Sequence, residues 1–250
     1  RVNSEQIVGQ TELAVNNFFD SMKSKLMLIR DVVENTENDD ELKSRLSTLT
    51  YVQNDIYAVT IYGENGEILS SIGNAAELKK HIYKDLSFDK ELFDSGDEIV
   101  FSEPHVQTLF KDSYPWVITT ALRMRKNVLD GAYIAVDFKF SEIAAYIDNV
   151  GVGRQGYCFI EDKNGNIVYH PQQQLLFSGL KDEDVKLISK MTDGTKSEKD
   201  KIYTVKTSDG GNWRIVSVAY TGELAAERRT QIIISVAITV LSCAAVLLIV

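Results

Sequence analysis

Apolar side chains recur at helical spacing through the first 36 residues. Two sets of positions, each repeating every seven residues, are almost entirely apolar: Val8, Val15, Met22 and Ile29, then Glu12, Phe19, Leu26 and Val33. This pattern predicts one long amphipathic helix that runs toward the acidic segment 34–41. The stripe suits either the protein's own sheet or the same helix of a partner chain, and the heptad alone leaves both open.

The end of the chain is uniformly apolar. Residues 232–250 carry no charged side chain over nineteen positions, which at about 1.5 Å per residue matches the roughly 30 Å hydrocarbon core of a bilayer. We therefore predict a transmembrane helix at 232–250, preceded by a connector at 221–231. Because a helical pattern begins directly after Arg1, we expect a further membrane helix before it, so that residues 1–231 lie outside the cell membrane.

Two stretches in the middle of the chain share one pattern. Residues 58–69 read AVTIYGENGEIL, and 99 residues later 157–168 read YCFIEDKNGNIV. Each predicts a strand, a type I′ turn at Asn-Gly and a returning strand. A second match, Trp116-Val-Ile against Trp213-Arg-Ile, lies 97 residues apart. Together they indicate a duplicated module.

The repeat sets the expected domain organisation. We predict an α+β chain that begins with a long helix and its connection at 1–49. A first module at 50–140 and a second at 151–220 follow, joined by a short apolar helix at 141–150.

Composition and chemistry narrow the function. The chain carries 36 acidic against 27 basic residues, a formal charge of -9, which disfavours a nucleic acid partner. Cys158 and Cys243 lie in a folded module and in the apolar terminus, so we expect no disulfide. The three histidines have no metal-ligand spacing, and neither a phosphate-binding glycine loop nor a G-x-S-x-G elbow is found. We expect no catalytic site, no cofactor and no metal in this chain.

A specific motif surrounds the second Asn-Gly turn. Residues 153–171, GRQGYCFIEDKNGNIVYHP, closely resemble the membrane-proximal module of the double Cache family. The resemblance implies two tandem PAS-like antiparallel-sheet modules behind a long N-terminal helix. It also implies an extracellular sensor in which the first module binds a small ligand. We expect the second module mainly to transmit the signal, because its strands end in bulky or apolar groups and it directly precedes the predicted membrane helix. His170, which precedes a proline, is expected to be structural.

The cytoplasmic activity that such a sensor controls is inferred from shorter stretches of the sequence. YHPQQQLLFSGL at 169–180, with HVQTLF at 105–110 and YPWVI at 114–118, is most similar to YesM-type sensor histidine kinases. The resemblance implies a two-component histidine kinase, with a chemotaxis receptor or a diguanylate cyclase as alternatives. A membrane-tethered protein-interaction module without a small ligand is the alternative from another class. The resemblance also implies a homodimer, which cysteines placed at Val15 or Met22 would test by crosslinking.

Strand alternation suggests where a ligand binds. In the strands expected at 57–62, 116–123 and 132–138, one face is apolar and the other carries small, hydroxylated and charged side chains. We predict a pocket lined by Tyr62, Thr119, Arg123, Tyr133 and Asp137. The alternative is that Arg123 and Asp137 only form a cross-strand salt bridge.

The ligand class is addressed by one further comparison within the family. Amino-acid-binding members carry an Arg-x-Trp-Tyr run in the first module, and residues 85–93 here contain neither the Arg nor the Trp. We therefore expect a ligand other than an amino acid. Asp137, however, falls where the amino-acid-binding members place an acidic ligand contact.

Overall fold

The structure of the 250-residue chain is a computed structural model. It describes residues 2–73, 78–79, 99–128, 130–153, 155–209, 213–222, 229–230, 232–239 and 242. The chain divides into two compact units. We call residues 14–146 the first module, and residues 1–13 with 147–250 the second module.

Two helices precede the first sheet. Helix α1 spans Val2–Glu34, and α2 spans Asp39–Val52 in a segment that the sequence assigned to a connection. Asn38 caps α2, because its side chain accepts hydrogen bonds from the N–H groups of Asp40 and Glu41. Leu42 and Leu46 then bury one face of the new helix. The acidic character of 34–41 therefore marks a helix start and not an extension of α1.

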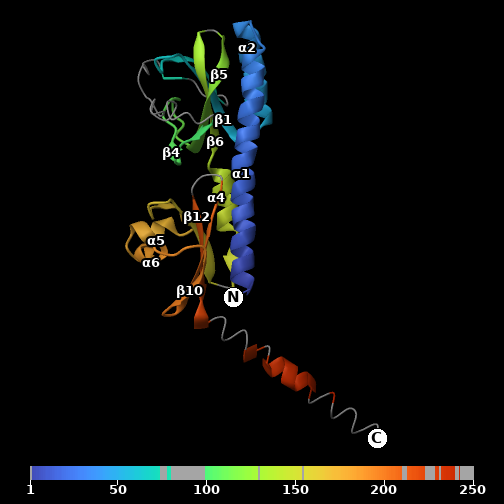
Figure 1. Ribbon diagram of the computed structural model, residues 1–250, viewed down its shortest axis with the longest axis vertical. Coiled ribbons are helices and arrows are strands. Elements are labelled where there is room, and N and C mark those ends of the chain that lie inside the picture. The colour runs from blue at the N-terminus through green and yellow to red at the C-terminus, as the bar shows by residue number, and fades with distance from the viewer. Residues whose placement is uncertain are drawn as a thin grey trace. The chain divides into compact units, whose positions relative to one another are not determined.

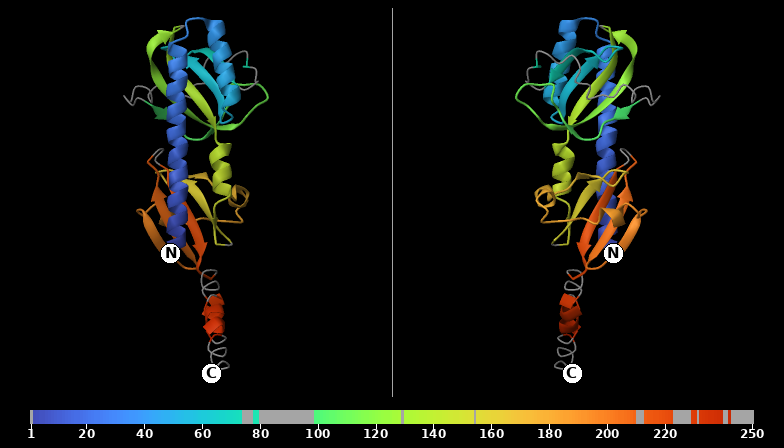
Figure 2. Two further views of the ribbon diagram at one scale, coloured as in Figure 1. Left: turned by 90° about the vertical axis from the view of Figure 1, so that its right-hand side faces the viewer. Right: turned by 90° about the vertical axis from the view of Figure 1, so that its left-hand side faces the viewer.

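The heptad stripe of α1 is used within the chain. Val15 and Met22 are fully buried, as are the apolar residues that follow each of them by four positions. Figures 1 and 2 show α1 and α2 covering one face of the first module's sheet. Cysteines at Val15 or Met22 cannot reach a partner helix from these positions, so the proposed crosslinks at those two sites were wrongly placed. The homodimer itself stays a prediction.

The first module's sheet is antiparallel and has six strands. Their order is β2-β1-β6-β5-β3, with β4 also paired to β5. The strands are β1 (Ile56–Tyr62), β2 (Ile68–Gly73), β3 (Val100–Phe101), β4 (His105–Val106), β5 (Trp116–Val128) and β6 (Gly131–Lys139). Strand β6 is buried along nearly its whole length, so both faces of the sheet are covered.

A helix, α4 (Ser141–Asp148), follows the first sheet, close to the linking helix predicted at 141–150. The second module has its own six-stranded antiparallel sheet, in the order β10-β11-β12-β8-β7 with β9 paired to β8. Its elements are β7 (Gly151–Val152), β8 (Gly156–Glu161), β9 (Ile167–Tyr169), α5 (Gln173–Phe177), α6 (Val185–Ile188), β10 (Gly194–Glu198), β11 (Lys201–Thr207) and β12 (Arg214–Tyr220).

Each face of the second sheet has its own apolar cluster. One contains Tyr157, Phe159, Ile188, Tyr203, Val205, Val216 and Val218. The other contains Val152, Cys158 and Ala219, against which Ile7 of α1 packs. Figure 1 accordingly shows the start of α1 on one side of this sheet and the α5–α6 segment on the other. The segment between β9 and β10 thus covers the face that carries Tyr157.

The two Asn-Gly hairpins close in the same way. Gly66 and Gly165 have φ angles of 81° and 84°, whereas the asparagine before each has no positive φ. The N–H of each glycine donates to the carbonyl three residues earlier, at Gly63 and Asp162. A type I′ turn needs two consecutive positive φ angles, so the predicted turn type is wrong although both hairpins form.

The two tryptophan segments do not occupy equivalent strands. Trp116 opens β5, whereas Trp213 directly precedes β12. In the first sheet the hairpin strand β1 pairs with β6, and in the second the hairpin strand β8 pairs with β12. Strand β12 therefore corresponds to β6 and not to β5. The two sheets share a strand order that fits a duplicated module. The match between the Trp116 and Trp213 segments, however, does not join equivalent strands.

The apolar terminus lies mostly outside the described residues. Residues 232–239 are helical, while 240–241 and 243–250, with Cys243, are not described. Within the described part, no helix has both the length and the apolar character that a membrane crossing requires. Cys158 is buried as a free thiol.

Candidate ligand-binding site

The register of the central strands places the predicted site residues on one face of the first sheet. Asp137 lies opposite Thr119 on β5, and Tyr133 lies opposite Tyr62 on β1 and Arg123 on β5. Directly paired residues in an antiparallel sheet project to the same side. The shared face predicted from strand alternation is therefore confirmed, and its role in ligand binding stays a prediction.

The start of β1 departs from simple alternation. The pairing with β6 slips between Ile56 and Ala58, which is a β-bulge. As a result Tyr57 packs beside Ala58 in the cluster around Phe110, and its hydroxyl donates to Ser113 Oγ at 2.8 Å. Strict alternation along the strand predicted at 57–62 places Tyr57 on the face opposite to that of Tyr62, and this expectation is wrong because of the bulge.

Asp137 is the buried charge of this face. Thr119 Oγ1 donates a hydrogen bond to Asp137 Oδ1 at 2.5 Å, and Gln107 Nε2 donates a second one to Oδ2. Gln107 Oε1 accepts from the N–H of Leu109 at 2.8 Å, which fixes the amide with its nitrogen toward the carboxylate. Both carboxylate oxygens are thus held by neutral donors.

The network extends to the edge strands. His105 Nε2 lies 3.4 Å from Thr119 Oγ1, and its Nδ1 lies 3.3 Å from Ser102 Oγ. Ser102 Oγ in turn accepts from the N–H of Thr119 at 2.9 Å. Sequence reasoning did not select Gln107, His105 or Ser102, since they come from β4 and the segments beside β3 and β4, which are too short to show alternation.

The groups that hydrogen-bond to Asp137 carry no charge, so the negative charge of its buried carboxylate is only partly compensated. Burial raises the pKa of Asp137 above its usual range, and the hydrogen bonds from Thr119 and Gln107 together with the charge of His105 only partly oppose this. A ligand with a positive charge or strong donors near Asp137 would complete that compensation.

Arg123 and Tyr133 form a separate group nearer the other end of the strands. Arg123 Nη1 donates to the Tyr133 hydroxyl at 2.8 Å, and Arg123 Nη2 lies 2.5 Å from Glu64 Oε1 at the surface. The suggested Arg123–Asp137 salt bridge is therefore wrong, because Glu64 is the partner of Arg123. Tyr62 and Tyr133 are buried in an apolar cluster with Val100, Ala121, Ala132 and Ala135. The structure brings Thr119 and Asp137 together but places the other three predicted residues apart from them.

Part of the polar face is covered by the segment that follows β4. Leu109 and Phe110 pack on Ala58 and Val117. A Cβ atom at Gly73 would lie 2.8 Å from the Phe110 ring, so only glycine permits this approach. Residues 74–77 and 80–98 lie outside the described residues, and with them the segment 85–93.

A long N-terminal helix followed in the chain by two antiparallel sheets agrees with a family-level comparison. The model of the double Cache family, described as "Cache domain", matches residues 2–227. This chain belongs to the double Cache family. The family resemblance seen at residues 153–171 is thereby confirmed.

One curated relative with significant sequence similarity is the methyl-accepting chemotaxis protein McpB of Bacillus subtilis (strain 168). It is 24% identical over 223 residues, which cover 87% of this chain and 31% of McpB. This chain therefore spans about a third of that relative.

Two solved structures share the double Cache fold with this chain. One is the ligand-binding domain of the Pseudomonas aeruginosa PAO1 amino acid chemoreceptor PctC in complex with GABA. Its TM-score is 0.67 at 14% identity, over 86% of this chain and 97% of that one. The other is the extracellular domain of the candidate histidine kinase vpHK1S-Z8, with a TM-score of 0.65 at 11% identity, over 88% and 95% of the two chains. Neither the YesM-type subfamily nor the output is decided by these similarities.

The second Cache module contains a buried carboxylate of another kind. The Tyr157 hydroxyl donates to Glu183 Oε1, and His170 Nε2 lies 3.3 Å from the same oxygen. His170 Nδ1 accepts from the N–H of Gln172 at 2.9 Å, so the proton sits on Nε2 and points to Glu183. These contacts agree with the structural role expected for His170, which stays a prediction.

Two ammonium groups complete the surroundings of Glu183. Lys181 Nζ lies 3.5 Å from Oε1, and Lys201 Nζ lies 3.7 Å from Oε2. Burial, the largest single effect, would raise the pKa of Glu183. The hydrogen bonds from His170 and Tyr157 and the charges of Lys201 and Lys181 outweigh it, so the pKa is lowered. Burial and the hydrogen bond to Glu183 raise the pKa of Tyr157.

Proposed function

We propose that this chain is the extracellular sensor region of a bacterial membrane receptor, and that its first module binds a small polar ligand at Asp137. The buried carboxyl of Asp137, held only by neutral donors on a face of small and hydroxylated residues, carries this proposal. Such a group supplies both the direction and the strength of a contact to a ligand donor. Thr119, Gln107 and His105 are the side chains that would orient it.

We propose a ligand with an ammonium group, amino acids being the first class to screen. A ligand cation next to Asp137 would favour the ionised carboxylate, which burial alone disfavours. The complex of PctC with GABA supports this class. It conflicts with our expectation of a ligand other than an amino acid, which we based on residues 85–93 outside the described part of the chain.

For the output we propose a transmembrane receptor with either of two cytoplasmic activities. Similarity to McpB and PctC supports a chemotaxis receptor, and similarity to vpHK1S-Z8 supports a histidine kinase. The stretches at 105–110 and 169–180 favour the kinase. The charge-free run at 232–250 supports a membrane anchor that connects the sensor to this output. The sequence of the full-length protein would decide between the two.

A thermal-shift screen of amino acids and small amines against the 250-residue chain tests the function. We expect at least one compound to raise Tm, because a ligand that binds only the folded state stabilises it. Asp137→Ala should abolish that response while the protein stays folded, and Glu142→Ala, which removes an exposed carboxylate on α4, should retain it. An unchanged response in Asp137→Ala would place the ligand elsewhere.

A folded chain that responds to no compound would instead favour the membrane-tethered interaction module. That reading predicts binding to another protein through the exposed surface and no small-molecule response.

A further inference from the structure

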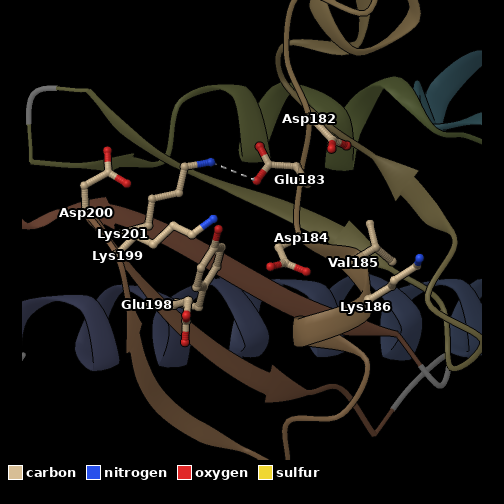
Figure 3. A pocket seen from close by; sticks show the side chains of 10 residues that line it. Asp182, Glu183, Asp184, Val185, Lys186, Glu198, Lys199, Asp200 and Lys201 are labelled. Atoms are coloured by element: carbon tan, nitrogen blue, oxygen red, sulfur yellow. Dashed lines mark ion pairs between the residues drawn. The ribbon is translucent and has the colours of Figure 1, made fainter.

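The second module contains a cleft that is not part of the ligand site proposed at Asp137 in the first module. It has a volume of about 600 Å³ and lies between the segment 182–186 and the β10–β11 turn at 198–201 (Figure 3). Its floor consists of the buried residues Glu183 and Tyr203 with the half-buried Lys201. Its rim consists of exposed side chains from both segments.

Glu183, which lines this cleft, has a buried carboxylate oxygen without a hydrogen bond. Its side chain is completely buried, and Oε2 accepts no hydrogen bond from any described residue. The pair that Figure 3 marks between Oε2 and Lys201 is 3.7 Å long, which exceeds a hydrogen bond. A buried carboxylate oxygen without a donor is costly, so a donor that reaches it is favoured.

The charges of the residues that line the cleft indicate which charge a ligand should carry. Five carboxylates face three ammonium groups: Asp182, Glu183, Asp184, Glu198 and Asp200 against Lys186, Lys199 and Lys201. An excess of negative charge around a recess raises the local concentration of cations. The cleft therefore favours a positively charged occupant.

The arrangement favours an organic cation over a metal ion. No group of three or more His, Cys, Asp or Glu side chains in the described part of the chain is placed to hold a metal. An ammonium group needs only one or two oxygens and supplies the N–H donors that Glu183 Oε2 lacks. Aromatic rings nearby also accept ammonium groups, since Lys181 Nζ lies 3.5 Å from the centroid of the Tyr157 ring.

We infer that this cleft is a second binding site, for a small organic amine whose ammonium group hydrogen-bonds to Glu183 Oε2. The ligand competes with Lys201 for this oxygen. Lys201 has four rotatable side-chain bonds and meets Glu183 in a pair longer than a hydrogen bond, so it can turn away toward the rim. The site is independent of Asp137 and of the ligand proposed for the first module.

Calorimetric titration of the 250-residue chain with 1,4-diaminobutane tests the site. The matched control is the bis-quaternary analogue in which each nitrogen of the diamine carries three methyl groups, because it keeps both positive charges and their spacing but has no N–H donors. We expect the diamine to bind and its bis-quaternary analogue to bind at least about tenfold more weakly, as expected for a charge-assisted hydrogen bond. Equal binding of the two cations, or no binding of the diamine, would overturn the inference.

Three variants separate this site from a general attraction to cations. Glu183→Gln should weaken diamine binding at least about tenfold. Because Glu183 is buried and its loss can affect folding, the double variant Glu198→Gln/Asp200→Asn provides a test at exposed positions and should also weaken binding. Lys201→Met removes the competing ammonium group and should strengthen it. Weaker binding in Lys201→Met would contradict the assigned competition.

The variants also show which of the two modules binds the diamine. If the diamine binds the first module instead, Asp137→Ala would abolish its heat of binding and the three second-module variants would leave it unchanged. That result would overturn this inference and leave the proposed sensor function intact.

Discussion

Each module contains a buried carboxylate where the segment that covers its sheet meets the sheet, Asp137 in the first and Glu183 in the second, and the charges of these two are balanced in opposite ways. Asp137 in the first module is held by a hydroxyl and an amide, and its pKa is raised. Glu183 in the second module is surrounded by two ammonium groups, an imidazole and a phenol, and its pKa is lowered. Neutral donors orient a buried carboxylate but leave its charge only partly compensated. The carboxylate of the first module is thus prepared to gain a cation, whereas in the second module the protein's own cations compensate most of the charge and only Glu183 Oε2 lacks a hydrogen-bond donor.

The largest expected effect is the loss of Glu183. Glu183→Ala leaves Lys181 and Lys201 without their shared partner and removes the acceptor of the Tyr157 hydroxyl. Breaking a buried charge cluster in this way destabilises a protein by about 3–5 kcal/mol. Urea unfolding of the 250-residue chain, followed in the second module by the fluorescence of Trp213, measures this change.

The matched control is Glu198→Ala, which removes an exposed carboxylate from the same cleft and should change stability by no more than about 0.5 kcal/mol. If the two variants unfold at the same urea concentration, the compensation of Glu183 by its neighbours does not stabilise the second module.

Asp137→Asn should have a smaller effect and the opposite sign. The amide keeps an acceptor for Gln107 and a group that can bond to Thr119, while the cost of burying a charge disappears. At neutral pH we expect the free energy of unfolding to rise by on the order of 1 kcal/mol. A loss of stability would show that the charge of Asp137 is already fully compensated.

The same variant predicts a pH dependence. Because the pKa of Asp137 is higher in the folded state, the wild type loses stability as pH rises from the unfolded value near 3.8 to the folded pKa. The advantage of Asp137→Asn should grow over that window and vanish below it. The lowered pKa of Glu183 acts in the other direction, since its stabilisation is present above about 4.5 and is lost as pH falls through the folded pKa. Urea unfolding at a series of pH values distinguishes the two.

The smallest effect is expected at Arg123. Its contact with Glu64 joins two side chains that are 59% and 50% exposed, and such surface pairs contribute less than about 1 kcal/mol. Arg123→Ala should therefore reduce stability only slightly, and less so at high salt because mobile ions screen exposed charges. A salt-independent loss would instead point to the packing of Arg123 on the Tyr133 ring, where the guanidinium lies 5.1 Å from the ring centroid.

Much of the fold could be predicted from local patterns. The stripe of α1, the two Asn-Gly hairpins and the common face of Thr119 and Asp137 follow from periodicity, because each repeats over several residues. The bulge beside Tyr57 could not be predicted, since it depends on how β1 pairs with β6. The position of Trp213 depends in the same way on strand order, which a local match cannot reveal.

The polar residues around the two carboxylates were harder to predict. Gln107 and His105 reach Asp137 and Thr119 from short edge segments, where no alternation is visible. Glu183 lies in an irregular stretch among other acidic residues, and only the fold shows that it alone is buried there while Asp182 and Asp184 are exposed. In both modules the missing information was tertiary.

The side-chain amide of Gln107 connects the 109–110 segment, which packs over the site proposed in the first module, to the carboxylate of Asp137. Its nitrogen holds Asp137 and its oxygen holds the N–H of Leu109, next to Phe110. A ligand that displaces this nitrogen would also loosen the hold on Leu109, so we expect occupancy of the carboxylate and anchoring of the 109–110 segment to oppose each other reciprocally. Faster hydrogen exchange at the Leu109 N–H on ligand binding would show that this one side chain couples ligand binding to the segment that packs over the site.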